Sequence, residues 1–489
     1  MLVFGCSRCC WGLGVSEKLL QYERIARTLT TQIERSILRP GDRMPSLREM
    51  HEQSGASLGT IAHAYQRLED AGLIEARPRS GYYVRPRPSP PAAEPAVSSP
   101  RAGSTKVNVA SLVFDVLDAI KRPEIVALGS AFPSPEHFPI EKLNRAAAAA
   151  ARRLSTWSSV RDLPPGNSEL RRLIALRYAE SGVDVVPEDI VITCGAMEAI
   201  NLSLNAVGRP GDIIAIESPT FFNTLLSIER MGMKVVEIAT SPRDGIDLGS
   251  LQNALDTLDV TACIVMSNFQ NPLGALMPDE KKRELVAMLA RSNIPLIEDD
   301  VYAELYYGKT KPRPAKAFDR SGLVLHCGSF AKSLAPGARI GWVIPGRFKS
   351  EIERLKFITT ISTASLPQAA LAEYLKTGGY ERHLREFRQR LSASLAATTQ
   401  AVTTHFPGGC RLSQPQGGYM LWVEMPESID ALQLHRRALA EGISIAPGPL
   451  FSVRKKYKNF IRLNYGHFDA KSTVNAVRTL GQLSADLLL

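Results

Sequence analysis

Long apolar runs are absent from this sequence. None reaches the roughly 18 residues that a membrane-spanning helix needs, so we expect no membrane partner. The first sixteen residues lack a basic start, a long apolar core and a small-residue cleavage site, so we expect no export signal. We interpret residues 1–16 as a disordered leader, or as the product of a start codon placed too early.

Cysteine is also scarce. The chain has seven cysteines, an odd number scattered along its length, which is typical of a protein in a reducing cytoplasm. Cys6, Cys9 and Cys10 have the spacing of half a metal site, but no histidine or second cysteine pair lies near them in the sequence. We therefore predict a cytoplasmic protein without a metal site.

Charge is not concentrated in one segment, although the net charge is +10. The pI near 9 permits an anionic partner, with nucleic acid as the first candidate. Between Ser16 and Pro88, however, twelve Lys and Arg residues stand against nine Asp and Glu residues. Charge alone therefore does not identify the partner. The length of 489 residues suggests about three domains at roughly 150 residues each.

The segment 17–85 begins with the pattern of two helices. Apolar residues from Leu19 to Ile37 recur at three- and four-residue steps, which predicts one long helix that Pro40-Gly41 ends. Ser46 and Glu49 then have the spacing of a capping box, in which the serine caps the helix and the glutamate returns the contact. This predicts a short helix from Leu47 to about Gln53.

A third helix and a hairpin follow in the same segment. The helix should begin at Ser57, after the turn at Gly55, and end at Gly72. It should bury Ile61, Ala64, Tyr65 and Leu68. Residues 73–77 and 81–84 alternate as two strands. Two helices around a glycine turn, followed by a hairpin, predict a winged helix-turn-helix whose second helix can enter the major groove of DNA. The spacing alone fits equally a helical packing module whose arginines are only solvated.

Three stretches of this domain, residues 40–49, 65–74 and 79–84, resemble the DNA-binding domain of GntR-type regulators. The resemblance implies contacts to double-stranded DNA from Arg43, Ser46, Arg48, Ser57, Thr60, His63 and Arg79. These regulators usually have arginine after the serine that opens the recognition helix, and this chain has Leu58. The operator sequence is therefore not predicted.

The composition changes after the winged helix. From Arg85 to Thr105 it is rich in Pro, Ala, Ser and Arg and has no apolar period. Such a segment is expected to be a semi-extended tether. We place the linker at residues 86–112 and a second globular domain at residues 113–489.

The second domain has the pattern of an α/β fold with a mostly parallel sheet, because apolar strand-like runs alternate with helical ones. Five such runs end in polar or aromatic residues: 189–193, 213–216, 263–266, 295–297 and 323–326. Ligands bind beyond the carboxyl ends of strands in sheets of this kind. The sequence therefore predicts a binding site at that edge of the sheet.

Each of these strand ends also has an ordinary explanation. Phe221 is more often a core residue, Asn271 before a proline is usually a turn, and the acidic residues 298–300 are commonly solvated. Five such ends in succession, however, favour a site. Ala196 and Met197 should open a helix there, and their free backbone amides suit a phosphate.

Lys332 follows the last of these strands and decides the chemistry of the site. A lone lysine in a loop is usually solvated. Here Ser329 lies three residues before it and Arg339 seven residues after it. These residues suit a site in which an amine bonds an aldehyde while a hydroxyl and a guanidinium hold a phosphate.

The stretch 328–342 resembles the lysine motif of fold-type I, aspartate-aminotransferase-like pyridoxal-phosphate proteins, and the likeness extends from about Val113 to Gly466. It implies pyridoxal 5'-phosphate as the cofactor, joined to Lys332 as an internal aldimine, with Asp299 paired to its ring nitrogen. The other implied cofactor contacts are Asn271, Tyr302, Phe221, Ser329, Arg339 and the amides of Ala196 and Met197. The family more often has Tyr or Trp at the stacking position that Phe221 takes here.

The same resemblance places Arg462 where the family binds the α-carboxylate of an amino acid. The alternative for Arg462 is a structural salt bridge. A GntR-like domain joined through a proline-rich tether to an aminotransferase-like domain resembles the MocR-type subfamily of GntR transcription regulators.

The resemblance implies a homodimeric, DNA-binding transcription regulator that senses an amino compound, or pyridoxal phosphate itself, at Lys332. The alternative is a working aminotransferase with an accessory DNA-binding domain. The sequence does not name the effector, the operator or the direction of regulation.

Overall fold

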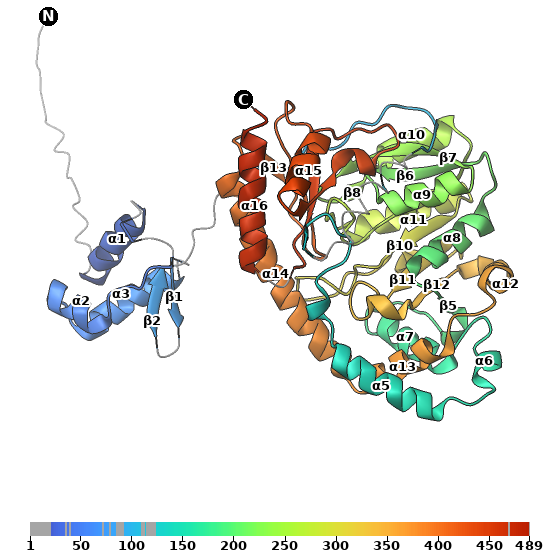
Figure 1. Cartoon of the computed structure of the whole chain (residues 1–489), viewed down its shortest axis with the longest axis horizontal. Coiled ribbons are helices and arrows are strands. Elements are labelled where there is room, and N and C mark those ends of the chain that lie inside the picture. Colours follow the sequence, from blue (N-terminus) through green and yellow to red (C-terminus); the bar gives the residue numbers. More distant parts are fainter. Residues whose placement is uncertain are drawn as a thin grey trace, which may run out of the picture. The chain divides into compact units, whose positions relative to one another are not determined.

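The computed structural model describes residues 21–34, 37–38, 41–70, 73–77, 80–84, 92–108, 113, 124–467 and 470–488. The chain divides into two compact units, Met1–Pro91 and Ala92–Leu489 (Figure 1). Each unit has its own hydrophobic core. The expected leader at residues 1–16, with Cys6, Cys9 and Cys10, lies outside the described residues, as does Arg79.

The first unit is a winged helix-turn-helix. Its elements are α1 (Gln21–Glu34), α2 (Leu47–Ser54), α3 (Leu58–Asp70), β1 (Ile74–Arg77) and β2 (Gly81–Val84). The strands β1 and β2 pair antiparallel as the wing. The capping box at Ser46 and Glu49 is present, and the four residues predicted to be buried on α3 are all buried. The predicted winged helix-turn-helix is confirmed.

The first helix is shorter than its apolar pattern predicts. It ends at Glu34, and Ile37, which was expected on its buried face, is 65% exposed. The core of this unit takes Ile25, Leu29 and Ile33 from α1. The apolar spacing in the sequence therefore extends beyond the last residue of α1.

The second unit contains a large sheet in the order β3-β7-β6-β9-β10-β11-β12-β5, with β8 paired to β7. The five strands from β7 to β11 are mutually parallel, whereas β12 runs antiparallel to both β11 and β5, and β3 antiparallel to β7. The strands are β3 (Thr105–Lys106), β5 (Val191–Thr193), β6 (Ile213–Ser218), β7 (Lys234–Ser241), β8 (Gly245–Ile246), β9 (Val260–Val265), β10 (Leu296–Asp299), β11 (Val324–Ser329) and β12 (Gly341–Ile344). The predicted mostly parallel sheet is confirmed.

Helices cover both faces of this sheet. Successive strand residues point to opposite faces, so Ile214 and Ile216 pack into one core cluster while Ala215 packs into another. The first cluster includes side chains from α8 and the second from α10 and α11. The strands are buried on both faces, which is why they appear in the sequence as continuous apolar runs. The helices around the sheet are α5 (Ile140–Arg153), α6 (Ser158–Arg161), α7 (Ser168–Ala179), α8 (Ala196–Val207), α9 (Phe222–Arg230), α10 (Leu248–Thr257), α11 (Asp279–Arg291), α12 (Lys349–Thr360) and α13 (Ser365–Lys376).

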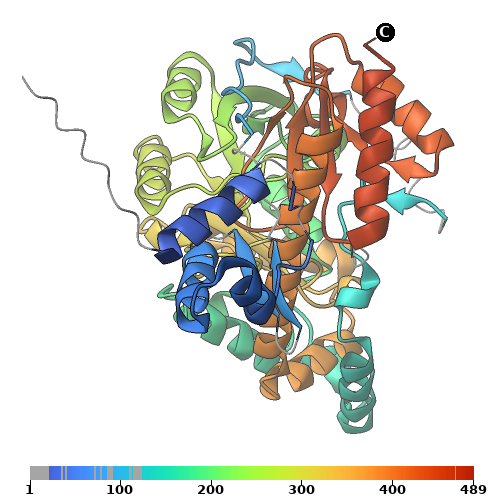
Figure 2. The same ribbon diagram turned by 90° about the vertical axis from the view of Figure 1, so that its left-hand side faces the viewer.

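A smaller, C-terminal layer follows the long helix α14 (Gly379–His405). Its sheet has the order β13-β14-β17-β16, and a short parallel pair joins β15 to β4. The α16 helix packs beside α14 in both views (Figures 1 and 2). The elements of this layer are β4 (Val126–Ala127), β13 (Arg411–Leu412), β14 (Met420–Glu424), α15 (Ala431–Ala440), β15 (Ile443–Ser444), β16 (Ala446–Pro447), β17 (Phe460–Asn464) and α16 (Ala470–Ala485).

The predicted tether at residues 86–112 differs from the structure between Ala92 and Lys106. From Ala92 to Lys106 the chain lies on the C-terminal unit. The Ser98 amide donates to Thr240 O at 3.1 Å, and Glu94 forms an ion pair with Arg243. The strand β3 joins the edge of the large sheet. The compact unit therefore begins at Ala92 and not at residue 113, because backbone hydrogen bonds hold a segment that has few apolar side chains.

Among the described helices, none combines the length and the apolar character that crossing a membrane requires.

Candidate functional site

The carboxyl ends of the parallel strands bring together the residues that the sequence analysis singled out. Asp299 ends β10, Ser329 ends β11, and Lys332 lies in the turn that follows β11. Their neighbour Arg462 comes from β17 of the smaller sheet, and it donates through a guanidinium nitrogen to Asn271 Oδ1 at 3.2 Å. The predicted edge of the sheet is thus a meeting point of both layers.

The Lys332 amine is largely enclosed. It donates to Ala131 O at 2.8 Å and lies 3.9 Å from the centre of the Phe132 ring. Burial lowers the pKa of Lys332 to about 7, against the effect of the Asp299 carboxylate, which favours the ammonium form. Near neutral pH a large fraction of this amine is therefore unprotonated, which a nucleophilic lysine requires.

Asp299 is the nearby acidic group. Its side chain is 3% exposed, and burial raises its pKa to about 6, although the positive charge of Lys332 opposes that rise. The Asp299 Oδ1 atom has no hydrogen-bond partner among the residues that the structure describes. A buried carboxylate oxygen without a donor is costly, so this atom fits a site that receives an N–H group from a ligand.

Asn271 and Arg462 have the same property. Asn271 Nδ2 and Arg462 Nε are buried and lack a partner among the described residues. Arg462 is 0% exposed and donates to the Gly129 carbonyl as well as to Asn271. No carboxylate within the described part of the chain forms an ion pair with it, so the structural salt bridge considered for Arg462 is not found there.

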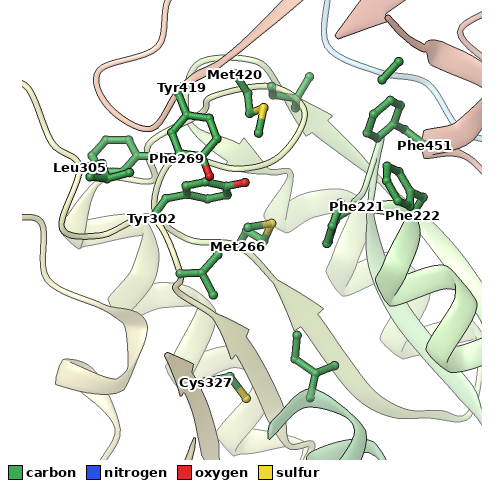
Figure 3. Close-up of a cluster of buried hydrophobic side chains, with 14 of the residues drawn as sticks. Phe221, Phe222, Met266, Phe269, Tyr302, Leu305, Cys327, Tyr419, Met420 and Phe451 are labelled. Atoms are coloured by element: carbon green, nitrogen blue, oxygen red, sulfur yellow. The ribbon is translucent and has the colours of Figure 1, made fainter. Parts of the chain in front are cut away.

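Tyr302 lies between these groups and a second tyrosine. Figure 3 shows the Tyr419 hydroxyl pointing toward Tyr302, and the two rings meet edge to face with their centres 5.2 Å apart. Burial raises the pKa of both phenols far above the ordinary value, so both are neutral donors at neutral pH. The Tyr419 hydroxyl donates to Ala131 O at 3.1 Å, the same carbonyl that Lys332 uses.

The residues expected to hold a phosphate gather at the start of α8. Gly195 is the N-cap of α8. The first backbone hydrogen bond of this helix runs from Ala199 N to Gly195 O. The amides of Ala196 and Met197 come before it, where helix amides have no partner within the helix. A Cβ atom on Gly195 would lie 2.6 Å from an Arg339 guanidinium nitrogen, so Arg339 lies against the same helix end. A phosphate suits a guanidinium beside a helix N-terminus.

Ser329 lies close to the start of α8. It pairs with Gly341 across strands β11 and β12. Gly341 in turn packs so closely on α8 that a Cβ atom added to it would lie 2.8 Å from Ala196 N. The Ser329 hydroxyl already forms two hydrogen bonds near Lys332. It donates to Ile340 O at 3.0 Å and accepts from Ala331 N. The hydroxyl still has a second lone pair.

Phe221 is buried at the N-cap of α9. Its ring centre lies 4.8 Å from that of Phe222, and Phe222 in turn contacts Phe451 (Figure 3). Phe451 also lies 5.4 Å from the guanidinium carbon of Arg462. The aromatic cluster therefore extends from Phe221 toward Arg462.

Neither the segment Gly129–Phe132 nor Tyr419 was predicted from the sequence to belong to the site. The segment contributes the carbonyls of Gly129 and Ala131 and the ring of Phe132 to the site, and such contacts carry no chemical signature in a sequence. Tyr419 follows Gly417-Gly418 and precedes the strand β14. That position, a glycine pair before a strand, was the only signal of its role in the sequence.

The polar residues predicted to contact DNA lie mostly at the surface of the first unit. Arg43 and Arg48 are exposed. The Ser46 hydroxyl caps α2, and the Ser57 hydroxyl forms a 2.8 Å hydrogen bond with Thr60 Oγ1 at the start of α3. Their contacts with DNA stay predictions.

His63 of α3 is exposed at one edge but stacks on Tyr22 of α1, with ring centres 4.2 Å apart. Leu58, which stands where these regulators usually have arginine, is 48% exposed. A contact between His63 and a base would therefore compete with a ring stack, whereas Leu58 is already at the surface.

Comparisons with known proteins agree with both halves of the chain. Residues 125–480 match the family of aminotransferases class I and II, and residues 21–84 match the gntR family of bacterial regulatory proteins. The HTH-type transcriptional regulator YdcR of Escherichia coli K12 is 44% identical over 96% of this chain and 100% of its own length. This chain belongs to the same family of transcriptional regulators. The MocR-like arrangement identified from the sequence is thereby confirmed.

Two solved structures match the C-terminal part of this regulator. The kynurenine aminotransferase of Pyrococcus horikoshii has a TM-score of 0.72 and 26% identity over 77% of this chain and 95% of its own. LysN of Thermus thermophilus, an α-aminoadipate aminotransferase complexed with N-(5'-phosphopyridoxyl)-L-leucine, has a TM-score of 0.70 and 27% identity over the same shares. The regulator therefore carries an aminotransferase fold, and that fold family is pyridoxal-phosphate dependent.

Proposed function

We propose that this regulator holds pyridoxal phosphate at Lys332 and senses an amino compound there, and that the winged helix reports the result to DNA. One observation carries the proposal: buried atoms of Asp299, Asn271 and Arg462 lack a partner in the described structure. The family resemblance assigns the same residues to the cofactor ring and to an amino-acid carboxylate. These orphaned atoms fit the cofactor, because each has the polarity that its assigned ligand atom needs.

Different residues would bind different parts of the cofactor and the effector. Arg339, Ser329 and the amides of Ala196 and Met197 would hold the phosphate. Asp299 would keep a proton on the ring nitrogen, Asn271 and Tyr302 would hydrogen-bond the ring hydroxyl, and Phe221 would cover one ring face. When bound, the cofactor supplies an aldehyde that can bond an amine and a ring that withdraws electrons. Arg462 would bind and orient the carboxylate of the effector.

Sensing would follow from competition between two amines. The effector amine would displace Lys332 from its bond to the cofactor, while Arg462 holds the effector carboxylate. The ligand would shift the arrangement of the domains only as far as it binds one arrangement more tightly than another. Pyridoxal phosphate itself is a second candidate effector, and it would use the same residues.

We propose that the regulator is a cytoplasmic homodimer. Large apolar side chains are exposed on two segments, one before Pro165 and one before Thr363. Both segments contact Ile192 of β5: Ile192 N donates to Pro165 O at 2.9 Å, and Thr363 Oγ1 donates to Ile192 O at 3.5 Å. These side chains are Trp157, Val160, Phe357, Ile358 and Ile361, each more than half exposed. A second copy is the partner that would cover them, as dimers are usual for this fold.

A working aminotransferase is the second candidate. The same orphaned atoms support it, because Asp299 and Arg462 would serve an enzyme as well as a sensor. The DNA-binding unit favours regulation. The two candidates differ in rate and in DNA selectivity: an enzyme would convert the bound cofactor to its amine form at each turnover, whereas a sensor needs only reversible exchange.

An absorbance titration of the full-length protein tests the proposal. The cofactor-supplemented protein should show the visible band of a lysine-bound aldehyde, and a panel of amines and amino acids should shift it. Sequence-selective, salt-sensitive binding to DNA upstream of its gene should change with the same compounds. A protein that stays colourless, or a borohydride-trapped label at a residue other than Lys332, would contradict the proposal. Fast transamination without selective DNA binding would favour the enzyme.

A further inference from the structure

Ser333, the residue after Lys332, is held by two side chains of α14. The Tyr380 hydroxyl lies 2.7 Å from Ser333 Oγ, and His383 Nε2 lies 2.8 Å from Ser333 O. Tyr380 is 2% and His383 8% exposed. One residue of the lysine turn is therefore clamped at both its side chain and its carbonyl, and neither Tyr380 nor His383 has a role in the site described above.

The two contacts come from one face of a regular helix, since Tyr380 and His383 are three positions apart. A carbonyl oxygen only accepts, so the Nε2 atom of His383 must carry the hydrogen and donate it. Burial lowers the pKa of His383, which favours the neutral ring with one N–H. The interaction is therefore specific for a side chain that can donate from that position.

Other contacts keep both rings in place. The guanidinium carbon of Arg177 lies 4.5 Å from the centre of the Tyr380 ring, and Arg177 is itself paired with Glu304 and Glu381. The His383 ring stacks on that of Phe387, with centres 5.7 Å apart. The clamp is thus part of a packed wall and does not depend on free side-chain rotation.

Residues 329–335, the turn that carries Lys332, have further hydrogen bonds, and the Lys332 amine itself donates to Ala131 O. The closing hydrogen bonds of the turn run from the amides of Leu334 and Ala335 to Phe330 O, and Ala331 N donates to Ser329 Oγ. The Ser333 contacts fix the middle of the turn. Because Ser333 adjoins Lys332, both contacts act on the backbone that carries the amine.

We propose that Tyr380 and His383 are positioning residues that act through Ser333 to keep the Lys332 amine buried beside Asp299. The proposal deepens the function proposed above and rests on Lys332 as its reactive residue. Loss of the clamp should let the turn shift and the amine reach water. Its pKa should then rise from about 7 toward the ordinary value for lysine, because burial is the main cause that lowers it.

Chemical labelling of Lys332 tests this without the cofactor. The full-length protein, free of pyridoxal phosphate, is treated briefly with acetic anhydride at a series of pH values, and mass spectrometry follows the peptide that contains Lys332. Only the neutral amine reacts, so the pH profile gives the pKa of that lysine. The variants are Tyr380→Phe, His383→Leu and His383→Gln, and glutamine can still donate where His383 Nε2 does.

Tyr374→Phe is the matched control. Tyr374 is a buried tyrosine of the neighbouring α13 helix, and its hydroxyl has no hydrogen-bond partner in the described part of the chain. Circular dichroism of each variant checks that it folds. A rise of one pKa unit would lower the labelling rate at pH 6 about tenfold.

We expect a midpoint near pH 7 in the wild type and in Tyr374→Phe, a higher midpoint in Tyr380→Phe and His383→Leu, and recovery in His383→Gln. The proposal is wrong if Tyr380→Phe and His383→Leu match the control, or if His383→Gln behaves as His383→Leu does. A wild-type Lys332 that titrates as an ordinary lysine also overturns it. These outcomes are separate from failure of the proposed function, which would appear as wild-type protein that takes up no pyridoxal phosphate.

Discussion

The two units of this protein use polar side chains in opposite ways. In the winged helix, Arg43 and Arg48 are exposed and can contact a partner while remaining hydrated. In the aminotransferase-like unit, Asp299 and Arg462 are 3% and 0% exposed. Electrostatic interactions weaken in water and strengthen where water is excluded.

This difference predicts how each unit responds to substitution. An exposed contact to DNA is one of many, is screened by salt, and contributes modestly. A buried group whose partner is missing costs the full desolvation of that group. Single substitutions should therefore have large effects in the buried site and graded effects in the winged helix.

The largest effect is expected for Lys332→Ala, which removes the amine that we propose bonds the cofactor. The visible absorbance band of the lysine-bound aldehyde should be lost completely, and borohydride trapping should leave no label on this peptide. Lys349→Ala, at a half-buried lysine of α12 that lies outside the proposed site, is the control and should keep both signals. A band that survives in Lys332→Ala would place the reactive amine elsewhere.

Asp299→Asn should have the next largest effect. It replaces the proposed charged partner of the ring nitrogen by a neutral one. A hydrogen bond to a charged group contributes about 1.5–3 kcal/mol, so affinity for pyridoxal phosphate should fall roughly 10- to 150-fold. Equilibrium dialysis or a fluorescence titration measures this. The control is Asp259→Asn at an exposed position. Equal affinities in the two variants would exclude Asp299 as the ring partner.

The rate of cofactor uptake should depend on pH, because the buried Lys332 amine changes its protonation state near neutrality. Below pH 7 most Lys332 amines are protonated and cannot attack, so the rate should rise about tenfold per pH unit and level off above pH 7. The Asp299 carboxylate favours the ammonium form, so Asp299→Asn should move this rise to lower pH. Stopped-flow absorbance gives the profile. A shift to higher pH would contradict the assigned interaction.

The exposed unit should give a smaller, salt-dependent effect. Arg48→Ala should weaken binding to the operator several-fold and reduce the slope of log affinity against log salt by about 0.9, as expected for one lost phosphate contact. Fluorescence anisotropy at several salt concentrations measures both. Arg67, which pairs with Glu23 of α1, provides the control variant Arg67→Ala. An unchanged salt slope in Arg48→Ala would exclude a phosphate contact.

The smallest effect is expected for Ser46→Ala. It removes the N-cap of α2, where the serine hydroxyl accepts from Glu49 N at 3.2 Å. The free energy of unfolding of the winged helix should fall by about 1 kcal/mol. Denaturant titration of the full chain measures this change. Ser54→Ala, at the other end of α2, provides a comparison at a position without an N-cap. A loss much above that value would mean that Ser46 has a further structural role.

Features set by local chemistry were predictable from the sequence. The capping box needs only Ser46 and Glu49, and the buried strands show as apolar runs because both faces of the sheet are covered. The lysine turn and the helix start at Ala196 also follow from neighbouring residues. The sequence therefore predicted the fold class and located the strand ends that form the candidate site.

Features that depend on backbone atoms far apart in the sequence were not predictable. The segment from Ala92 to Lys106 looks like a tether because hydrogen bonds such as that from Ser98 N to Thr240 O leave no trace in composition. Ala131 O contacts an amine 201 positions away. The stack of His63 on Tyr22 likewise depends on how α1 and α3 pack.

The carbonyl of Ala131 has a kinetic consequence. It accepts from both Lys332 and Tyr419, so the Lys332 amine must give up this hydrogen bond before it can attack an aldehyde. Loading of the site should accordingly show an activation barrier before covalent capture.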